Sequence, residues 1–157
     1  MLKILGIDPG SRVVGLALLE IKKDKAYYKS SHILKLKKNK ISSKLSFLLE
    51  QFEVYLKKTK PDVVIIEDNF YHKNPKVLLT LGRISGVLIA LSSKFGLPVF
   101  LYSPTDIKKS ITGFGQASKE QVAYMVKEIL KLKGNTFADA TDAISIALCY
   151  YYKNNSL

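Results

Sequence analysis

Two acidic residues close short apolar runs of the sequence. Asp8 follows residues 4–7 (ILGI), and Glu67 follows residues 63–66 (VVII). Runs of this kind are typical of buried strands, so each carboxylate should stand at the carboxyl end of a strand. Ligands of open α/β sheets bind at that edge. Taken singly, Asp8 before its Pro-Gly dipeptide could be only a turn former, and Glu67 could be only a cap or the partner of a lysine.

A second acidic pair lies near the end of the chain. Asp139 and Asp142 occur in the segment ADATDA, residues 138–143. Positions three apart share one face of a helix, and this face continues into Ile146 and Tyr150. The two aspartates are therefore expected to extend a buried stripe, although Asp139 alone could merely favour the start of a helix.

Four carboxylates brought into one site would repel one another. No Arg or Lys stands beside any of them in the sequence, and buried charges need partners. A divalent cation would supply the missing charge, and ligation by oxygen alone suits Mg²⁺ or Mn²⁺. Two such ions could clamp the attacking and leaving oxygens of a phosphodiester. The pattern predicts metal-dependent phosphodiester hydrolysis, with carboxylates as metal ligands and not as covalent nucleophiles.

The remaining patterns predict the elements that must bring these carboxylates together. Strands are expected at residues 2–8, 12–20, 27–36, 62–67 and 97–102. Helices are expected at 42–59, at 75–94, from 104, at 118–132 and at 137–153. This order predicts an α/β fold with a five-stranded mixed sheet, three antiparallel strands and then two parallel ones, flanked by helices on both faces. The strand at 27–36 should form a lysine-rich edge, and the strands at 62–67 and 97–102 should be buried.

Length and charge limit the possible functions. The 157 residues suit one domain, 1–157, and exclude two-lobed ATPases and dehydrogenases. Lys and Arg number 25 against 13 Asp and Glu, a net charge of +12 that favours a polyanion such as nucleic acid, unless the proteome itself is lysine-rich. Twelve of the basic residues fall between Lys22 and Lys60, away from the acids.

Other features indicate a cytoplasmic protein without a membrane partner. No apolar run approaches the roughly 20 residues that span a bilayer, and the first residues are strand-like and not those of a signal peptide. The single cysteine, Cys149, allows no internal disulfide and is most simply a core residue.

Four segments together resemble the RuvC family of bacterial Holliday junction resolvases. They are residues 6–12 (GIDPGSR), Ile66-Glu67, Phe70-x-x-Lys73-Asn74 and residues 138–143, in matching order over nearly the whole chain. The resemblance implies an RNase H-like fold, a homodimer, and Mg²⁺ as cofactor, for which Mn²⁺ would substitute, with two ions per active site. It also implies paired symmetric cleavage of four-way DNA junctions in recombination and repair, and RuvA and RuvB as partners.

The same resemblance implies roles for single residues. The two strand-end acids and the two helical aspartates would be the metal-binding catalytic residues. Lys108 and Lys119 match lysines that contact DNA, and Phe70 matches an aromatic residue that stacks on or wedges into the open junction. Lys73 belongs to the same DNA-binding set. From the sequence alone, the lysines could equally be solvated, and Phe70 could anchor its loop.

The helix at 75–94 departs from the family pattern and has more than one apolar side. Where the family carries Gly-Gln-Ala-Arg-Gly, this chain has Gly-Arg-Ile-Ser-Gly, so Arg83 is displaced by two positions. The basic tail of many members is also missing. An amphipathic helix with an apolar face left over favours a homodimer through residues 75–94, and the alternative is complete burial.

Two other functions remain possible on the sequence alone. The segment Gly-Ile-Asp-Pro-Gly also resembles the first phosphate loop of actin-like ATPases and sugar kinases, but these proteins need two lobes. A YqgF-type nuclease acting on RNA, or a junction-binding protein without cleavage, would share much of the pattern. The acidic quartet and the Phe70 segment favour RuvC.

Overall fold

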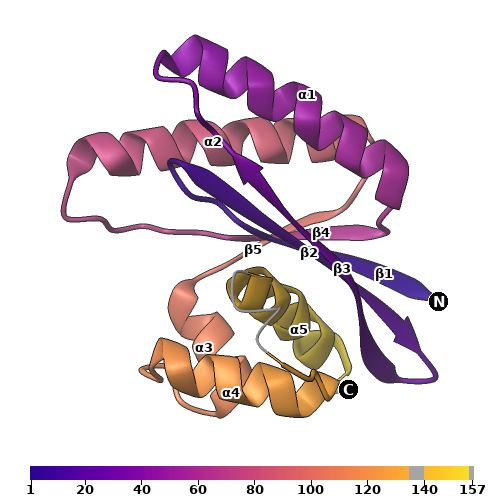
Figure 1. The fold of residues 1–157 in the computed structure, drawn as a ribbon. Helices are drawn as coiled ribbons and strands as arrows, with labels where there is room; N and C mark the ends of the chain where they lie inside the picture. Colours follow the sequence, from indigo (N-terminus) through magenta and orange to yellow (C-terminus); the bar gives the residue numbers. More distant parts are fainter. Residues whose placement is uncertain (135–139, 156–157) are drawn as a thin grey trace.

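A mixed sheet between two layers of helices organises the chain (Figure 1). The structure is a computed structural model that describes residues 1–134 and 140–155. Its strands are β1 (Leu2–Asp8), β2 (Val13–Lys22), β3 (Lys25–Lys35), β4 (Val63–Glu67) and β5 (Val99–Tyr102). Its helices are α1 (Ile41–Thr59), α2 (Pro75–Lys94), α3 (Pro104–Thr112), α4 (Lys119–Leu130) and α5 (Thr141–Asn155).

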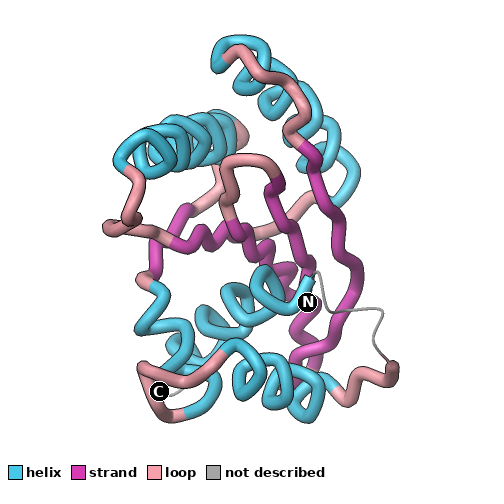
Figure 2. The backbone as a smooth tube through the Cα atoms, turned by 60° about the vertical axis from the view of Figure 1, so that its left-hand side comes forward, coloured by secondary structure: helices cyan, strands magenta, loops and turns pink. Residues whose placement is uncertain are grey.

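The sheet has the order β3-β2-β1-β4-β5. The first three strands pair antiparallel, and β4 and β5 join them in parallel, as predicted. Helices α1 and α2 cover one face of the sheet, and α3, α4 and α5 lie on the other (Figures 1 and 2). Because Ile7 pairs with Ile66, β1 and β4 end side by side, and Asp8 and Glu67 leave the sheet at the same edge.

Strand alternation decides which face each carboxylate reaches, because successive residues of a strand point to opposite faces. In β1 and β4, the residues that pack with α1 and α2 are Leu5, Ile7, Val64 and Ile66. The residues that pack with α5 are Ile4, Val63 and Ile65. Asp8 and Glu67 continue this second row, so both side chains emerge on the side of α5.

Helix α5 lies against β1 at a distance that only glycine permits. A Cβ atom added to Gly6 would lie 2.8 Å from the backbone nitrogen of Ala147 and would overlap the carbonyl oxygen of Ala143. The helix is consequently buried almost all round, from Ala143 to Cys149. Its first turn carries Asp142, which the close approach brings toward Asp8.

Two expectations differ from the structure, and part of a third is not described by it. Phe100 and Leu101 are exposed because β5 is the outermost strand, so the prediction of a buried strand at 97–102 is wrong. Asp142 does not extend a buried stripe; its side chain is 51% exposed at the open end of α5. The part of the last helix expected at residues 137–139 lies outside the described residues.

By length and composition, helix α2 is long and apolar enough to span a membrane. No such segment was expected from the sequence, and this helix was overlooked. It serves instead as a layer of the fold, because Ile84, Leu88 and Leu91 pack on the sheet and against α1. Only 22% of its apolar stretch is buried, so the alternative of a completely buried helix is excluded. The exposed stripe of α2 comprises Leu79, Arg83, Gly86 and Ala90.

The contact at Gly6 makes a testable prediction about stability. Gly6→Ala should lower the free energy of unfolding by about 3 kcal/mol or more, because the added methyl meets backbone atoms that cannot move aside. The matched control is Gly15→Ala on the adjacent strand, where the new Cβ would lie 3.6 Å from Asp8 and 3.7 Å from Ala143. This control should change stability by less than about 1 kcal/mol. Urea unfolding measures both, and equal effects would contradict the prediction.

Candidate active site

A cavity of about 260 Å³ opens where β1 and β4 end and α5 begins. Asp8, Glu67 and Asp142 line it, together with Lys108 from α3 and Lys119 from α4. The structure thus brings together five of the residues singled out from the sequence. The other lining residues are Asn69, Pro104, Ile107, Val122 and Ser145.

Burial and mutual repulsion dominate the electrostatics of the cavity. The pKa of Asp8 is raised to about 7, first by burial and then by the charges of Glu67 and Asp142, against a smaller opposing effect of Lys119. Burial also raises the pKa of Glu67, against the stabilising hydrogen bond from Asn69. Shifts of this kind in a cleft are typical of functional sites.

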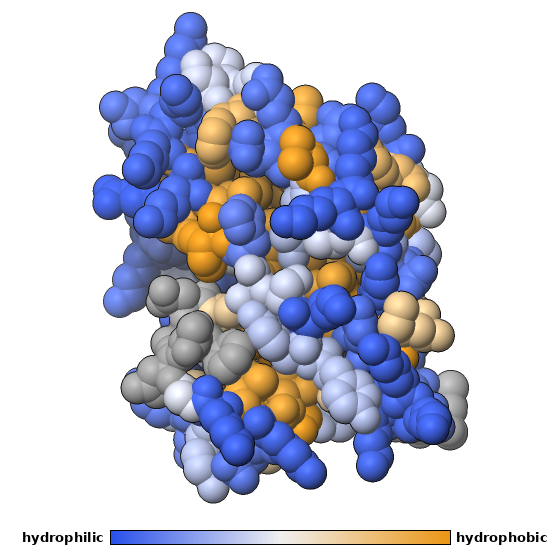
Figure 3. Space-filling view, turned by 45° about the vertical axis from the view of Figure 1, so that its right-hand side comes forward, coloured by the Kyte–Doolittle hydropathy of each residue, from blue (hydrophilic) through white to orange (hydrophobic). Residues whose placement is uncertain are grey.

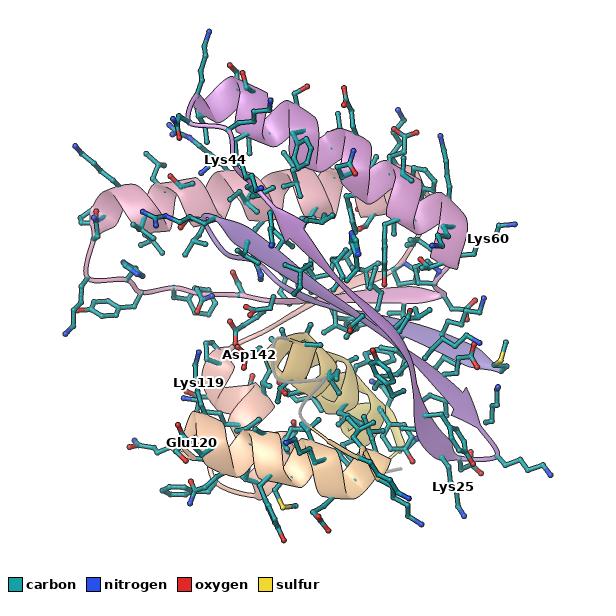
Figure 4. The ribbon with its side chains drawn as sticks, viewed as in Figure 1. Lys25, Lys44, Lys60, Lys119, Glu120 and Asp142 are labelled. Atoms are coloured by element: carbon teal, nitrogen blue, oxygen red, sulfur yellow. The ribbon has the colours of Figure 1, made fainter. Side chains whose placement is uncertain are left out.

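Two lysines reach the cavity from helices whose starts are firmly fixed. Lys119 is the first residue of α4, which begins with a reciprocal capping box between Ser118 and Gln121. Its Nζ lies 3.7 Å from a carboxylate oxygen of Asp142 (Figure 4). Lys108 lies on α3, and its charge lowers the pKa of Glu67. Both lysines stand where they could contact a phosphate next to the acids.

Asn69 is a site residue that the sequence analysis missed. Its Nδ2 donates a hydrogen bond of 3.1 Å to Oε2 of Glu67, which fixes the orientation of that carboxylate. Its position two residues after Glu67 could have indicated it, because residues two apart along an extended segment point to the same side. Asn69 therefore follows Glu67 toward the cavity.

A divalent cation fits the chemistry of this donor set. Asp8, Glu67 and Asp142 offer hard oxygen ligands, and burial together with the charges of Glu67 and Asp142 raises the pKa of Asp8, a penalty that a bound cation would offset. Within the described residues, no three acidic, His or Cys side chains form a ready-made cluster for an ion. Asp139, the fourth predicted ligand, lies outside the described residues.

Phe70 and Lys73 lie in the segment between β4 and α2, beside the cavity and not in its lining. The side chain of Phe70 is 74% exposed, so the expectation of an exposed aromatic is confirmed. Lys73 is exposed as well. His72 accepts a hydrogen bond of 3.0 Å from the backbone of Asn74, which itself caps α2. The segment is thereby held in shape while its aromatic ring faces solvent.

Three of the basic residues between 22 and 60, Lys25, Lys44 and Lys60, show where this charge lies (Figure 4). Lys44 donates a hydrogen bond of 2.7 Å to the carbonyl of Ser11, three residues after Asp8. It lies at the same end as Asp142, whereas Lys25 and Lys60 lie at the opposite end (Figure 4). Of this charge, Lys44 lies toward the end of the molecule that holds the acids (Figure 4).

Comparisons with known proteins agree with this geometry. The family model described as "Crossover junction endodeoxyribonuclease RuvC" matches residues 4–150. The chain belongs to the RuvC family. The RuvC protein of Tolumonas auensis is 38% identical over 154 residues, covering 98% of this chain and 89% of that protein. The RuvC protein of Shewanella oneidensis is 36% identical with the same coverage.

Solved structures extend the match to the fold. RuvC of T. thermophilus in complex with a Holliday junction substrate has a TM-score of 0.89 and 26% identity, over 98% of this chain and 95% of that one. The yeast mitochondrial Holliday junction resolvase has a TM-score of 0.71 at 19% identity, which supports the fold alone. The predicted RNase H-like fold is confirmed, and membership of RuvC disfavours the actin-like ATPase and YqgF alternatives.

The raised pKa of Asp8 predicts how stability changes with pH. Between its ordinary pKa of 3.8 and about 7, the folded protein keeps a proton that the unfolded chain has lost. Stability therefore falls as pH rises through this range. In EDTA at pH 8, Asp8→Asn should be more stable than the wild type by on the order of 2 kcal/mol.

Thermal unfolding of both proteins at matched pH measures this difference. It should shrink steadily below pH 7 and be smallest below the ordinary pKa of 3.8, where the wild-type carboxyl is protonated in both states. A variant that is less stable than the wild type at pH 8 would contradict the assignment of Asp8 to a repulsive cluster. The comparison is internally controlled, because other titrating groups are common to both proteins.

Proposed function

We propose that the chain is a structure-specific endonuclease that resolves four-way (Holliday) DNA junctions during recombination and repair. The observation that carries the proposal is the convergence of Asp8, Glu67 and Asp142 on one cavity with Lys108 and Lys119, in a member of the RuvC family. The reaction is hydrolysis of one phosphodiester in each of two symmetric strands.

The acids are proposed to act as metal ligands. Asp8, Glu67, Asp139 and Asp142 would hold Mg²⁺, or Mn²⁺ in its place, with two ions per active site. The bound ions would supply a reactive water and stabilise charge on the phosphate and the leaving oxygen. Asn69 keeps Glu67 in a ligating orientation through its hydrogen bond of 3.1 Å.

The cationic and aromatic residues are proposed to hold the DNA. Lys108 and Lys119 would contact phosphates beside the scissile bond, which positions the strand without reading its sequence. Phe70, exposed beside the cavity, would stack on a base of the opened junction. Lys73 and Lys44 would add phosphate contacts at the same end of the molecule, and such contacts weaken as salt rises.

The assembly is proposed to be a homodimer of one nuclease domain, residues 1–157, in the cytoplasm. Paired nicks require two active sites on one junction, and the exposed stripe of α2 is the surface through which we propose that two copies pair. Leu79, which is 55% exposed, stands in this stripe. On another face, seen in Figure 3, hydrophilic side chains dominate and hydrophobic ones form small patches. RuvA and RuvB are proposed as partners because of the family membership alone.

The cleavage reaction can be tested with labelled substrates. Four-way junction, linear duplex and structured RNA are incubated with Mg²⁺ or with EDTA. The wild type should make paired nicks in the junction only, and none in EDTA. Asp8→Asn should lower the cleavage rate at least about 10³-fold while junction binding persists, because it removes a metal ligand.

The matched control for this test is Asp106→Asn. Asp106 is an exposed aspartate of α3 that pairs with Lys153 at 3.6 Å and does not line the cavity. This control should cut at the wild-type rate. Cleavage by Asp8→Asn at the rate of the control would overturn the assignment of the site, and cleavage of RNA alone would point to a YqgF-type activity.

The dimer can be tested by a charge on the exposed stripe of α2. Leu79→Glu should convert the dimer to a monomer at micromolar concentration and abolish paired nicking, because it would bury a carboxylate in an apolar contact. Val54→Glu is the control, since Val54 is 61% exposed on α1. Light scattering after gel filtration reports the mass. A dimer that survives Leu79→Glu would exclude this surface.

A further inference from the structure

A second cavity, of about 210 Å³, lies next to the catalytic one. It shares Glu67 and Asn69 with the catalytic cavity, so the two are separated only by the end of β4. Asp68 and Phe70, in the segment after β4, form part of its wall, and so does Pro9, which directly follows β1. Helix α2 contributes Leu78, Leu81, Gly82 and Ser85.

Asp68 points into this second cavity and away from the catalytic one. The backbone nitrogen of Asp68 donates a hydrogen bond of 2.9 Å to the carbonyl of Tyr102, so the extended pairing of β4 with β5 continues through this residue. Alternation then places Asp68 in the row of Val64 and Ile66, which faces α2. Asp68 lines the second cavity only, whereas Glu67 reaches both.

The lining of the second cavity suits a flat, apolar group with a polar edge. Leu78, Leu81 and the ring of Phe70 supply apolar surface, and Asp68 and Ser85 supply polar atoms. Pockets that bind small flat ligands combine these two features. A phosphate is excluded, because the carboxylates of Glu67 and Asp68 would repel it. In a nucleic acid, the group that remains is a base.

We propose that this cavity is a nucleobase pocket, in which Asp68 reads a base beside the scissile phosphate. The proposal rests on the proposed junction cleavage and adds the determinant of its sequence preference. Guanine fits best, because its N1–H and its N2 amino group present two adjacent donors to one carboxylate. Thymine fits worst, because its single N–H lies between two carbonyl oxygens that the carboxylate repels.

The pocket also explains how a base could reach Asp68. Bases at the centre of an opened junction are free to leave the stack, and enzymes read such bases along their Watson–Crick edge. Phe70 stands at the mouth of the pocket and is exposed. A base that stacks on this ring would present its edge to Asp68 while its phosphate lies toward the catalytic cavity.

The test compares junctions that differ only in the nucleotides flanking the cleavage point. The wild type should cut best with guanine at one flanking position, at least about tenfold faster than with thymine there, as expected when a half-buried carboxylate is matched by two donors. Asp68→Asn should reduce this ratio at least fivefold, mainly by slowing cleavage of the guanine junction. Asp106→Asn, outside both cavities, should keep the wild-type ratio.

A second variant fills the pocket without touching the acids. Ser85→Leu should abolish the preference by excluding the base, whereas Ser93→Leu, at an exposed site on the same helix, should preserve it. Both must remain dimeric by light scattering. An unchanged guanine-to-thymine ratio in Asp68→Asn and in Ser85→Leu would overturn the pocket, as would a wild type indifferent to both flanking bases. Failure of the wild type to cut any junction would instead overturn the proposed function itself.

Discussion

The contact between the backbones of β1 and α5 at Gly6 is the constraint on which the site depends. Asp8 and Glu67 lie side by side because the neighbouring strands β1 and β4 end together. Asp142, in contrast, belongs to a helix that is far away in sequence. Only a residue without a side chain lets this helix approach the strand closely enough for Asp142 to join the other two. The burial of α5 over most of its length then holds it there.

The same arrangement works against the stability of the folded chain. Carboxylates that share a partly buried cavity lose solvation and repel one another, and burial first and this repulsion second raise the pKa of Asp8 to about 7. The hydrophobic contacts on both faces of the sheet must outweigh it. Lys119 offsets little, because its side chain and that of Asp142 are largely solvated. A site of this kind is built for a cation that arrives with the substrate or before it.

Much of the fold followed from hydrophobic period and turn residues. The succession of strands and helices along the chain, the change from antiparallel to parallel strands and the strand-end positions of Asp8 and Glu67 were all predictable. The sequence did not show that β5 is an outer strand of the sheet and not an inner one, because an apolar run of four to six residues is compatible with either position. The exposure of Asp142 was also missed. Helical periodicity shows toward which side of the helix a residue points, but not whether other elements still cover the helix at that turn. The role of Asn69 could have been predicted only by extending the alternation of side chains beyond the end of β4.

Alternation along β4 has a consequence for how this nuclease can change over evolutionary time. Glu67, the last residue of β4, and Asp68, which continues its extended backbone, point to opposite faces of the sheet and therefore have different tasks. Substitution at position 68 can alter which DNA sequence is preferred while the ligand at position 67 keeps its place. An inserted or deleted residue in β4 would exchange the two side chains and damage both tasks at once. Selection should thus fix the length of this strand while leaving position 68, directly after it, free to vary.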